Sequence, residues 1–186
     1  MTPSVPKRLV LRGAHSEDLE AIMALEEACF AMPWPAALIA ADLSGDGHSC
    51  YWVLLLDDAV IGYLGGWLVD LDFHLGSLAT SPAYRRRGFA RLLLLCALRH
   101  AAARDAETAF LEDRVSNRAA ARLYAGLGFR RLRLRRGYYT DNDEDAVEVA
   151  LIGLHEDATR ARLAEDVDLW LRDHSYDVHL TDFECR

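Results

Sequence analysis

Three polar side chains at the end of a predicted strand and in the helix after it have the spacing of a shared site. Glu112 lies in the apolar stretch 108–113, where alternate side chains point to the same face. Asn117 begins the next helical pattern, and Tyr124 follows after seven residues, which is two helical turns on a similar face. A carboxylate, an amide and a phenol suit proton transfer and hydrogen bonding. We therefore expect Glu112, Asn117 and Tyr124 to converge on one cleft.

Each of these residues also has a purely structural explanation. Glu112 can be a solvated or ion-paired carboxylate near a strand end, with Arg114 on its own face. Tyr124 can be a core tyrosine, and Asn117 can be only the N-cap of its helix. We assign no catalytic role to His74, because it stands alone in the sequence.

A second chemical feature is the stretch LATSPAYRRRGFAR at residues 78–91, where a strand pattern leads into arginines, a glycine and a helix. The first turn of a helix presents unpaired N–H groups and a partial positive charge, which bind phosphate. Gly88 and Ala90 are small where an anion must approach the backbone, and Arg85 to Arg87 add charge. The spacing matches neither the nucleoside-triphosphate loop nor the dinucleotide fingerprint. The alternative is a basic helix start with a turn glycine.

The distribution of charge supports an anion site in the middle of the chain. The 186 residues carry 21 basic and 29 acidic side chains, a formal net charge of −8. Residues 85–136 carry 14 basic and 4 acidic side chains, or +10, whereas residues 137–154 carry 5 acidic ones. Screening by salt limits the reach of each charge to about 10 Å, so the local excess of positive charge matters more for binding an anion than the net charge of the whole chain. The overall acidity argues against non-specific binding to nucleic acid or to anionic lipid.

The elements that must position these residues mix strands and helices without an internal repeat. Hydrophobic residues form 52% of the chain, which supports a packed core. Ser16 is the expected N-cap of the first helix, and Pro33 and Pro35 separate this helix from the second. Hydrophobic periodicity predicts strands at 7–12, 50–56, 59–69, 73–80, 108–113, 129–137 and 146–152, a first helix from the Ser16 cap to about residue 29, and further helices at 36–43, 88–103 and 117–125.

The end of the chain carries a different pattern. After Glu156 the strand pattern stops, and a helix containing Leu163 and Trp170 precedes an acidic, irregular end. We therefore expect a domain at 1–154 and an acidic, partly helical C-terminal extension at 155–186. The N-terminus lacks the apolar core of a signal peptide, and no apolar run is long enough to span a membrane. These features predict a cytoplasmic protein without a membrane partner.

Together these stretches resemble the GNAT family of N-acetyltransferases. Arg85-x-x-Gly88-x-Ala90 is similar to the family's acyl-CoA pyrophosphate loop, which lies between the fourth strand and the following long helix. The stretch LEDRVSNRAAARLYAGLGF, residues 111–129, is similar to the signature of the same enzymes. The resemblance covers about residues 8–154. It implies a mixed α/β GNAT fold, a mostly antiparallel twisted sheet with splayed central strands flanked by helices.

Other segments resemble, within that family, the ribosomal-protein-alanine N-acetyltransferases of the RimI type. The resemblance implies acetyl transfer from acetyl-CoA to the α-amino group of a protein N-terminus, specifically the alanine end of a ribosomal protein. It places Trp34, Tyr138 and Tyr139 at the substrate. The segments are Met32-Pro33-Trp34, Arg135-Arg136-Gly137-Tyr138-Tyr139 and YYTDNDEDA, residues 138–146.

The resemblance also implies roles for individual residues. Glu112 corresponds to the general base, which takes a proton from the amine directly or through water. Tyr124 corresponds to the general acid, the tyrosine that protonates the CoA sulfur. A backbone N–H on the strand at 73–80 is expected to hold the oxyanion. The residues expected to bind acetyl-CoA are Leu78, Ala79, Thr80, Arg85, Arg86, Arg87, Gly88, Phe89, Ala90, Arg91 and Asn117.

Asp113 departs from the family pattern, in which this position is apolar. It places a second carboxylate beside Glu112, but on the opposite face of the strand.

Two other functions stay open from the sequence. One is acetylation of a small amine or lysine, and the other is non-catalytic binding of acyl-CoA by a regulator. No metal site is expected, because the four cysteines show no CxxC pair.

Overall fold

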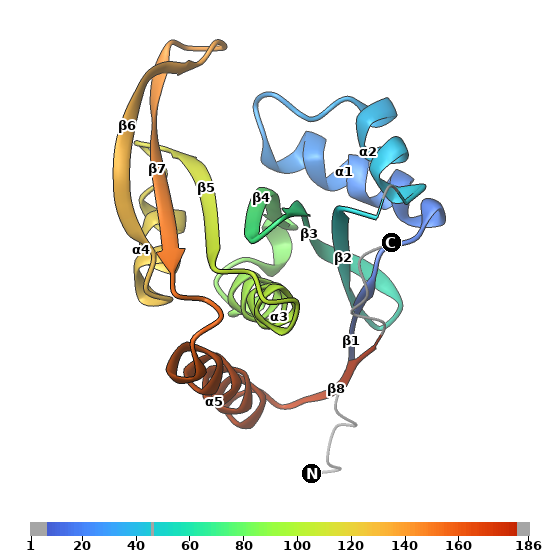
Figure 1. Ribbon diagram of the computed structural model, residues 1–186. Coiled ribbons are helices and arrows are strands. Elements are labelled where there is room, and N and C mark those ends of the chain that lie inside the picture. The colour runs from blue at the N-terminus through green and yellow to red at the C-terminus, as the bar shows by residue number, and fades with distance from the viewer. Residues whose placement is uncertain (1–6, 46, 182–186) are drawn as a thin grey trace.

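The computed structural model describes residues 7–45 and 47–181, which form an eight-stranded sheet with helices on both of its faces (Figure 1). The strands follow the order β6-β7-β5-β4-β3-β2-β1-β8. The β4–β5 and β1–β8 pairs are parallel, and the other neighbouring pairs are antiparallel. The strands are β1 (Lys7–Gly13), β2 (Ser49–Leu56), β3 (Ala59–Val69), β4 (Asp72–Thr80), β5 (Thr108–Arg114), β6 (Arg130–Tyr139), β7 (Glu144–Ile152) and β8 (Tyr176–Leu180). The helices are α1 (Leu19–Cys29), α2 (Ala36–Leu43), α3 (Phe89–Ala103), α4 (Arg118–Gly126) and α5 (Asp157–Asp173), with short 3-10 turns at η1 (Ser16–Asp18) and η2 (Pro82–Tyr84).

The mixed α/β fold class predicted from the sequence is confirmed. The elements predicted up to residue 152 are present, with ends that shift by no more than two residues.

The prediction that Ser16 is the N-cap of the first helix is wrong, because Ser16 begins the separate turn η1 and α1 begins at Leu19. The Asp18 carboxylate closes this turn by accepting a hydrogen bond from the backbone N–H of His15 at 2.7 Å. No helix among the described residues is long and apolar enough to cross a membrane.

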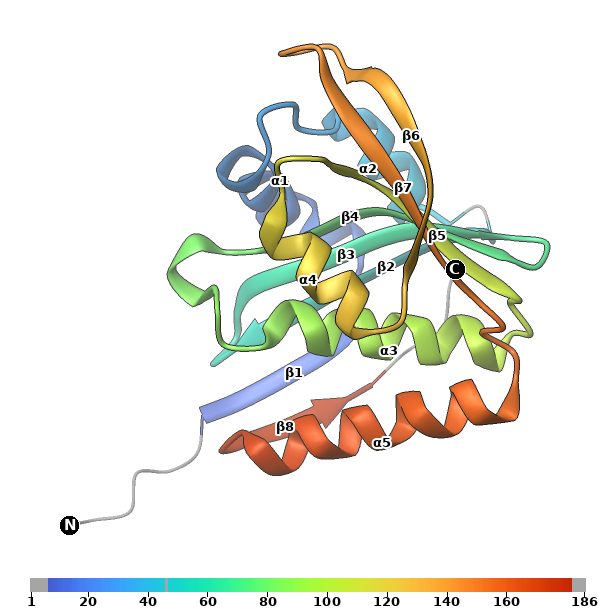
Figure 2. The same ribbon diagram turned by 90° about the vertical axis from the view of Figure 1, so that its left-hand side faces the viewer.

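The sequence predicts an irregular end after the last helix, and this prediction is wrong for residues 176–180. These residues form the strand β8, which pairs in parallel with β1. Within β8, Tyr176, Val178 and Leu180 are half-buried, while Asp177 and His179 are exposed. This alternation is typical of an edge strand with one covered face, and the acidic residues around it obscure the pattern in the sequence. Figures 1 and 2 show α5 beside α3, which it contacts along its length. The domain boundary at residue 154 stays a prediction.

The two faces of the sheet carry separate cores. On one face, α1 and α2 pack around Ile22, Ile39 and Tyr63. On the other face, α3 lies between the sheet and α5, so the consecutive side chains Leu92 to Leu98 are all buried. A helix that is apolar all round needs such cover on both sides. The continuous run LLLLCAL therefore follows from the position of α5.

The strands β4 and β5 separate soon after they begin. Their pairing covers only Asp72 to His74 against Thr108 to Phe110. A bulge in the β3–β4 pairing lies where Gly65 opposes Ser77. Figure 2 shows the later parts of the two strands diverging, with α4 beside β5 and α3 below the opening. The splayed central strands expected from the sequence are confirmed, and they leave an opening in the middle of the sheet.

Candidate active site

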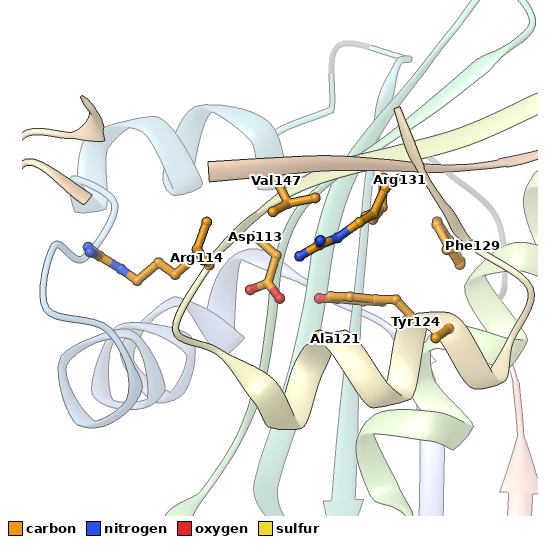
Figure 3. A pocket seen from close by; sticks show the side chains of 10 residues that line it. Asp113, Arg114, Ala121, Tyr124, Phe129, Arg131 and Val147 are labelled. Atoms are coloured by element: carbon orange, nitrogen blue, oxygen red, sulfur yellow. The ribbon is translucent and has the colours of Figure 1, made fainter. Parts of the chain in front are cut away.

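A pocket of about 180 Å³ lies beside the splayed part of β5, between β5, β7 and α4 (Figure 3). Tyr124 lines the pocket from α4 and Asp113 from β5, and the ends of these two side chains point toward one another. Phe129 and Val147 form part of its apolar wall. Burial, together with the nearby Asp113 carboxylate, raises the pKa of the Tyr124 hydroxyl. This phenol therefore carries its proton at neutral pH.

Asp113 is the acidic residue of this pocket. Its Oδ1 accepts a hydrogen bond from Nδ2 of Asn117 at 3.0 Å. Asn117 is also the N-cap of α4, because its Oδ1 accepts the N–H of Ala120 at 3.2 Å, as the sequence predicts. Burial raises the pKa of Asp113 to about 6, although the Asn117 hydrogen bond favours the charged form. Asn117 thus fixes both the start of α4 and the position of this carboxylate.

Glu112 takes part in a network of charges that spans four strands. Its Oε2 lies 3.0 Å from Nε2 of His74 on β4, and its Oε1 pairs with Arg135 on β6. Arg135 also lies 3.9 Å from the Glu148 carboxylate on β7. The Glu112 side chain is only 9% exposed. Both of its carboxylate oxygens therefore have cationic or hydrogen-bonding partners.

This network lies on the opposite face of the sheet from the pocket. Neighbouring residues of a strand point to opposite faces, so Asp113 turns to α4 while Glu112 turns away from it. Glu112 therefore does not share a face of β5 with Asn117 and Tyr124, and their convergence on one cleft stays a prediction. The opposite-face placement expected for Asp113 relative to Glu112 is confirmed. The β4–β5 pairing ends at His74 and Phe110, two residues before Glu112.

An aromatic band, which we define as Trp34, Trp67, His74 and Phe110, leads to Glu112 along the same face. The His74 ring stacks on Phe110 with a centroid separation of 4.5 Å and an angle of 7°. Trp67 lies 5.7 Å from His74, and Trp34 meets Trp67 edge to face at 6.2 Å. Trp34 is 41% exposed. The band thus forms a partly solvent-exposed path from the α1–α2 loop to Glu112.

A buried carboxylate on α1 holds the loop that carries Trp34. Glu26 is fully buried, and its Oε2 accepts the backbone N–H of Trp34 at 2.6 Å. Its Oε1 accepts the hydroxyl of Tyr63 and, at 3.3 Å, that of Ser77 on β4. The polar partners compensate for burial of this group. The loop backbone is therefore tied to the sheet next to the aromatic band.

The β6–β7 hairpin closes this region from the other side. Tyr139 donates its hydroxyl to the backbone carbonyl of Glu112 at 3.4 Å, and Arg135 lies 4.6 Å from the centre of the Tyr138 ring. At the hairpin turn, the Thr140 hydroxyl lies 3.8 Å from Sδ of Met32 in the α1–α2 loop. The three residues expected at the substrate, Trp34, Tyr138 and Tyr139, are thus on the two segments that flank Glu112.

The predicted phosphate loop lies at the start of α3. Gly88 is the N-cap of this helix with φ +81°, a left-handed conformation that favours glycine. Arg85, Arg86 and Arg87 are exposed beside it, and Nε of Arg85 donates to the carbonyl of Thr80 at 3.2 Å. Three exposed arginines thus directly precede the first helical turn, whose N–H groups have no partner within the helix, and this combination suits an anion.

Comparison with known proteins agrees with this geometry. Residues 19–129 match the acetyltransferase (GNAT) family. The chain belongs to the GNAT family. It is therefore an acetyltransferase, and the family resemblance and the fold expected from the sequence are confirmed. The GNAT family uses acetyl-CoA.

The relatives of this GNAT enzyme include proteins of the expected type. The putative ribosomal protein bS18-alanine N-acetyltransferase of Bacillus subtilis is 31% identical over 140 residues, 75% of this chain and 93% of that protein. The ribosomal protein bS18-alanine N-acetyltransferase of Escherichia coli K12 is 35% identical over 144 residues, 76% of this chain and 95% of that protein. The crystal structure of the Escherichia coli ribosomal-protein-S18-alanine N-acetyltransferase superposes with a TM-score of 0.73 at 31% identity, covering 78% and 94% of the two chains.

The C-terminal segment of the chain contacts the predicted phosphate loop at Gly88 and Phe89. The indole N–H of Trp170 on α5 donates to the carbonyl of Gly88 at 3.0 Å, and His174 stacks on Trp170 at 3.9 Å. Phe89, the first residue of α3, lies 6.2 Å from Trp170 and 5.6 Å from Tyr176 on β8. The segment with no counterpart in the family pattern therefore packs directly against the residues expected to hold phosphate.

The expected acetyl-CoA residues lie on two adjoining stretches of this GNAT fold. Leu78 to Thr80 end the splayed part of β4, and Arg85 to Ala90 form the loop and the first turn of α3. Arg91 differs from the other arginines, because it pairs with Asp166 of α5 at 3.1 Å. The binding roles of these residues and of Asn117 stay predictions.

Sequence reasoning missed the partners of Glu112. His74 appeared isolated because Glu112 is 38 residues away along the chain. The register of β4 and β5 pairs His74 with Phe110, which places the next residue on the same face, Glu112, beside the imidazole. Arg135 belongs to the motif Arg135-Arg136-Gly137-Tyr138-Tyr139, but sequence reasoning assigned it no role of its own. The alternating pattern of the two strands was a usable signal, but only once their pairing was known.

Proposed function

We propose that this chain transfers an acetyl group from acetyl-CoA to the α-amino group of a protein N-terminus, with Glu112 as general base and Tyr124 as general acid. The observation that supports this proposal most directly is that Glu112 and Tyr124 lie on opposite faces of the sheet, beside the part of β5 that is no longer paired with β4. A thioester in that opening has a carboxylate network on one side and a protonated phenol on the other. The two proton transfers of the reaction thus have separate groups.

The chain's own residues move the protons. Glu112 and its partners take the proton from the incoming ammonium, whose usual pKa of about 7.7–8.0 requires only a modest base. Acetyl-CoA supplies the carbonyl with which the nitrogen forms a C–N bond, and the C–S electron pair leaves on sulfur. Tyr124 donates its proton to that sulfur, and the second proton of the nitrogen replaces it. The balance is one amide, one thiol and one released proton.

The residues present fit the cofactor. Within the described residues, β4 has no pairing with β5 beyond His74, so backbone groups of its later part are available to the amides of the pantetheine arm. Thr80 ends this stretch, and the exposed Arg85 to Arg87 begin the next one beside the N–H groups of α3. An extended arm with a terminal pyrophosphate needs these two features in this order.

The acceptor side fits a peptide end. Trp34 and Tyr138 are both exposed at the edges of the region around Glu112, and the Thr140–Met32 contact joins the two segments that carry them. The relatives at 31–35% identity are named for alanine acetylation of ribosomal protein bS18. We therefore propose the alanine N-terminus of a ribosomal protein as the acceptor, and an acidic protein favours the approach of such a basic substrate.

Mass spectrometry of acceptor peptides tests this proposal. The purified protein is incubated with acetyl-CoA and peptides that begin with Ala, Ser or Met, and with an Nα-acetylated peptide that offers only a lysine amine. We expect acetylation of the Ala peptide at its N-terminus, with release of one CoA for each acetyl group. Acetylation only of the lysine side chain, or only of small polyamines in a parallel reaction, would show that the acceptor is another amine. No CoA release with any acceptor contradicts the catalytic proposal.

A further inference from the structure

The contacts of Glu112 determine which atoms an incoming amine can reach. Oε1 of Glu112 is occupied by Arg135, and Oε2 lies 3.0 Å from Nε2 of His74. The carboxylate is 9% exposed, whereas the His74 side chain is 38% exposed. A substrate arriving along the aromatic band therefore reaches the imidazole before it reaches the carboxylate.

Phe110, Trp67 and Glu112 together hold the orientation of the imidazole. The imidazole ring stacks on Phe110 with a centroid separation of 4.5 Å, and its centroid lies 5.7 Å from that of the Trp67 ring. The indole N–H of Trp67 in turn donates to the Asp42 carboxylate at 3.4 Å. When Nε2 carries the hydrogen that Glu112 accepts, Nδ1 carries the lone pair and is the basic atom of the ring. A carboxylate behind an imidazole stabilises the imidazolium that forms when the ring takes a proton.

We infer that His74 and Glu112 act as one proton-accepting pair, in which the imidazole of His74 takes the proton from the substrate ammonium and the buried Glu112 carboxylate orients and stabilises it. This inference rests on the proposed acetyl transfer and deepens it. The N–H bond of the ammonium breaks, its electron pair stays on nitrogen for attack on the thioester carbonyl, and the proton resides on the imidazole. The imidazolium then releases that proton to solvent through its exposed edge.

The charges around the pair support a reversible proton acceptor. Glu112 is directly beside His74, and behind it Arg135 and Arg133 face Glu148, at 3.9 and 2.7 Å. These two arginines and two glutamates balance, so the pair is neither strongly negative nor strongly positive before it takes the proton. On the other flanks the acidic groups are engaged, since Asp42 accepts from Trp67, and Glu26 of α1 binds Ser77, Tyr63 and Trp34.

Two substitutions at one position separate proton transfer from packing. His74→Phe keeps a ring against Phe110 and removes both nitrogens, and His74→Ala leaves space for added imidazole. We expect kcat/KM for the Ala peptide to fall about 100-fold in His74→Phe. The pH profile of this variant should also lose the part of the activity decrease at acidic pH that comes from the enzyme and not from the substrate amine. Millimolar imidazole should restore part of the activity of His74→Ala. The affinity for CoA, measured by calorimetry, should stay within about twofold of the unmodified protein.

A double variant tests whether the two residues act as a unit. His74→Phe combined with Glu112→Gln should lose no more activity than the stronger single variant, because groups of one catalytic unit are not additive. His155→Gln, at an exposed site before α5, is the matched histidine control and should behave as the unmodified protein.

The outcomes separate failure of this inference from failure of the proposed function. The inference is overturned if the unmodified protein acetylates the Ala peptide while His74→Phe keeps its activity and pH profile. It is also overturned if imidazole rescues nothing, or if the two losses multiply in the double variant. If the unmodified protein acetylates no N-terminus, the proposed function fails, and the role of His74 in it fails as well.

Discussion

The two sides of the β4–β5 opening are built from different interactions. On the acceptor side, ionisable groups from four strands surround Glu112, with His74 and Arg135 as its direct partners. On the cofactor side, the start of α3 is held mainly by aromatic packing, since Trp170 and Tyr176 lie against Phe89. The side proposed for the acceptor is thus a network of ionisable groups, whereas the side proposed for the cofactor combines exposed arginines with aromatic packing and the Trp170–Gly88 hydrogen bond.

This difference predicts which measurement each side controls. Charged groups whose protons move during the reaction affect turnover, because their interactions change between ground state and transition state. Groups that hold a helix N-terminus in place affect affinity for the anion bound there, since they position its N–H donors before binding. Substitutions on the acceptor side should therefore lower kcat, and substitutions in the C-terminal segment should weaken CoA binding.

The largest expected effect is that of Glu112→Gln. Loss of the carboxylate removes the group that stabilises the proton taken from the amine, so kcat/KM should fall about 100- to 1000-fold. Calorimetry should show an unchanged affinity for CoA. Glu148→Gln is the matched control, because this carboxylate also pairs with Arg135 but does not contact His74. Equal losses in both variants would mean that charge balance, not proton transfer, controls turnover.

Tyr124→Phe should lower kcat about 100-fold, because its hydroxyl protonates the leaving thiolate. The ring stays packed beside Phe129, so the melting temperature should change little. Steady-state kinetics with the Ala peptide measure kcat and the peptide KM separately, and only kcat should move. Tyr176→Phe on β8 is the control tyrosine for kcat at saturating acetyl-CoA, because the C-terminal segment is expected to affect CoA affinity and not turnover. A KM effect without a kcat effect in Tyr124→Phe argues against the general-acid role.

Trp170→Phe should weaken CoA binding about 3- to 10-fold, because removal of one hydrogen bond costs about 0.5–1.5 kcal/mol. The ring contacts are mostly kept, and the carbonyl of Gly88 loses its indole partner. Calorimetry with CoA gives the affinity, and kinetics at saturating acetyl-CoA should show an unchanged peptide KM. Gly88 itself is a poor probe, since an added Cβ would lie 2.6 Å from Nε1 of Trp170. A loss of kcat without loss of CoA affinity contradicts the comparison.

Asp113→Asn should have the smallest effect and the opposite sign, a gain in stability. Because the pKa of Asp113 is raised to about 6, the native state holds more protons than the unfolded state between about pH 4 and 6. Stability therefore falls as the pH rises through this window. The Asn variant lacks this penalty and keeps an acceptor for Asn117, so its melting temperature should be higher at pH 7 by a few degrees, at about 2–4 °C per kcal/mol. Thermal melts at pH 4 and pH 7 measure it, and an equal difference at both values contradicts the titration.

Much of the scaffold was predictable because its signals are local. The strand and helix boundaries up to residue 152 follow hydrophobic periodicity, and Asn117 caps α4 through a side-chain contact three residues away. Ser16 failed as a cap because Asp18, two residues further on, forms the turn with His15 instead. The sequence did not predict β8, because this strand forms by parallel pairing with β1, at the other end of the chain.

By itself, the sequence determined the family and the order of the elements, and it indicated a candidate phosphate loop and the catalytic candidates Glu112 and Tyr124. Only the tertiary structure decided which residues accompany them. Pairing of His74 with Phe110 brings an imidazole to Glu112, and strand alternation gives Asp113 to Tyr124 instead. Packing of α5 against α3 places Trp170 on Gly88. These contacts depend on registers between segments tens of residues apart, which no local pattern encodes.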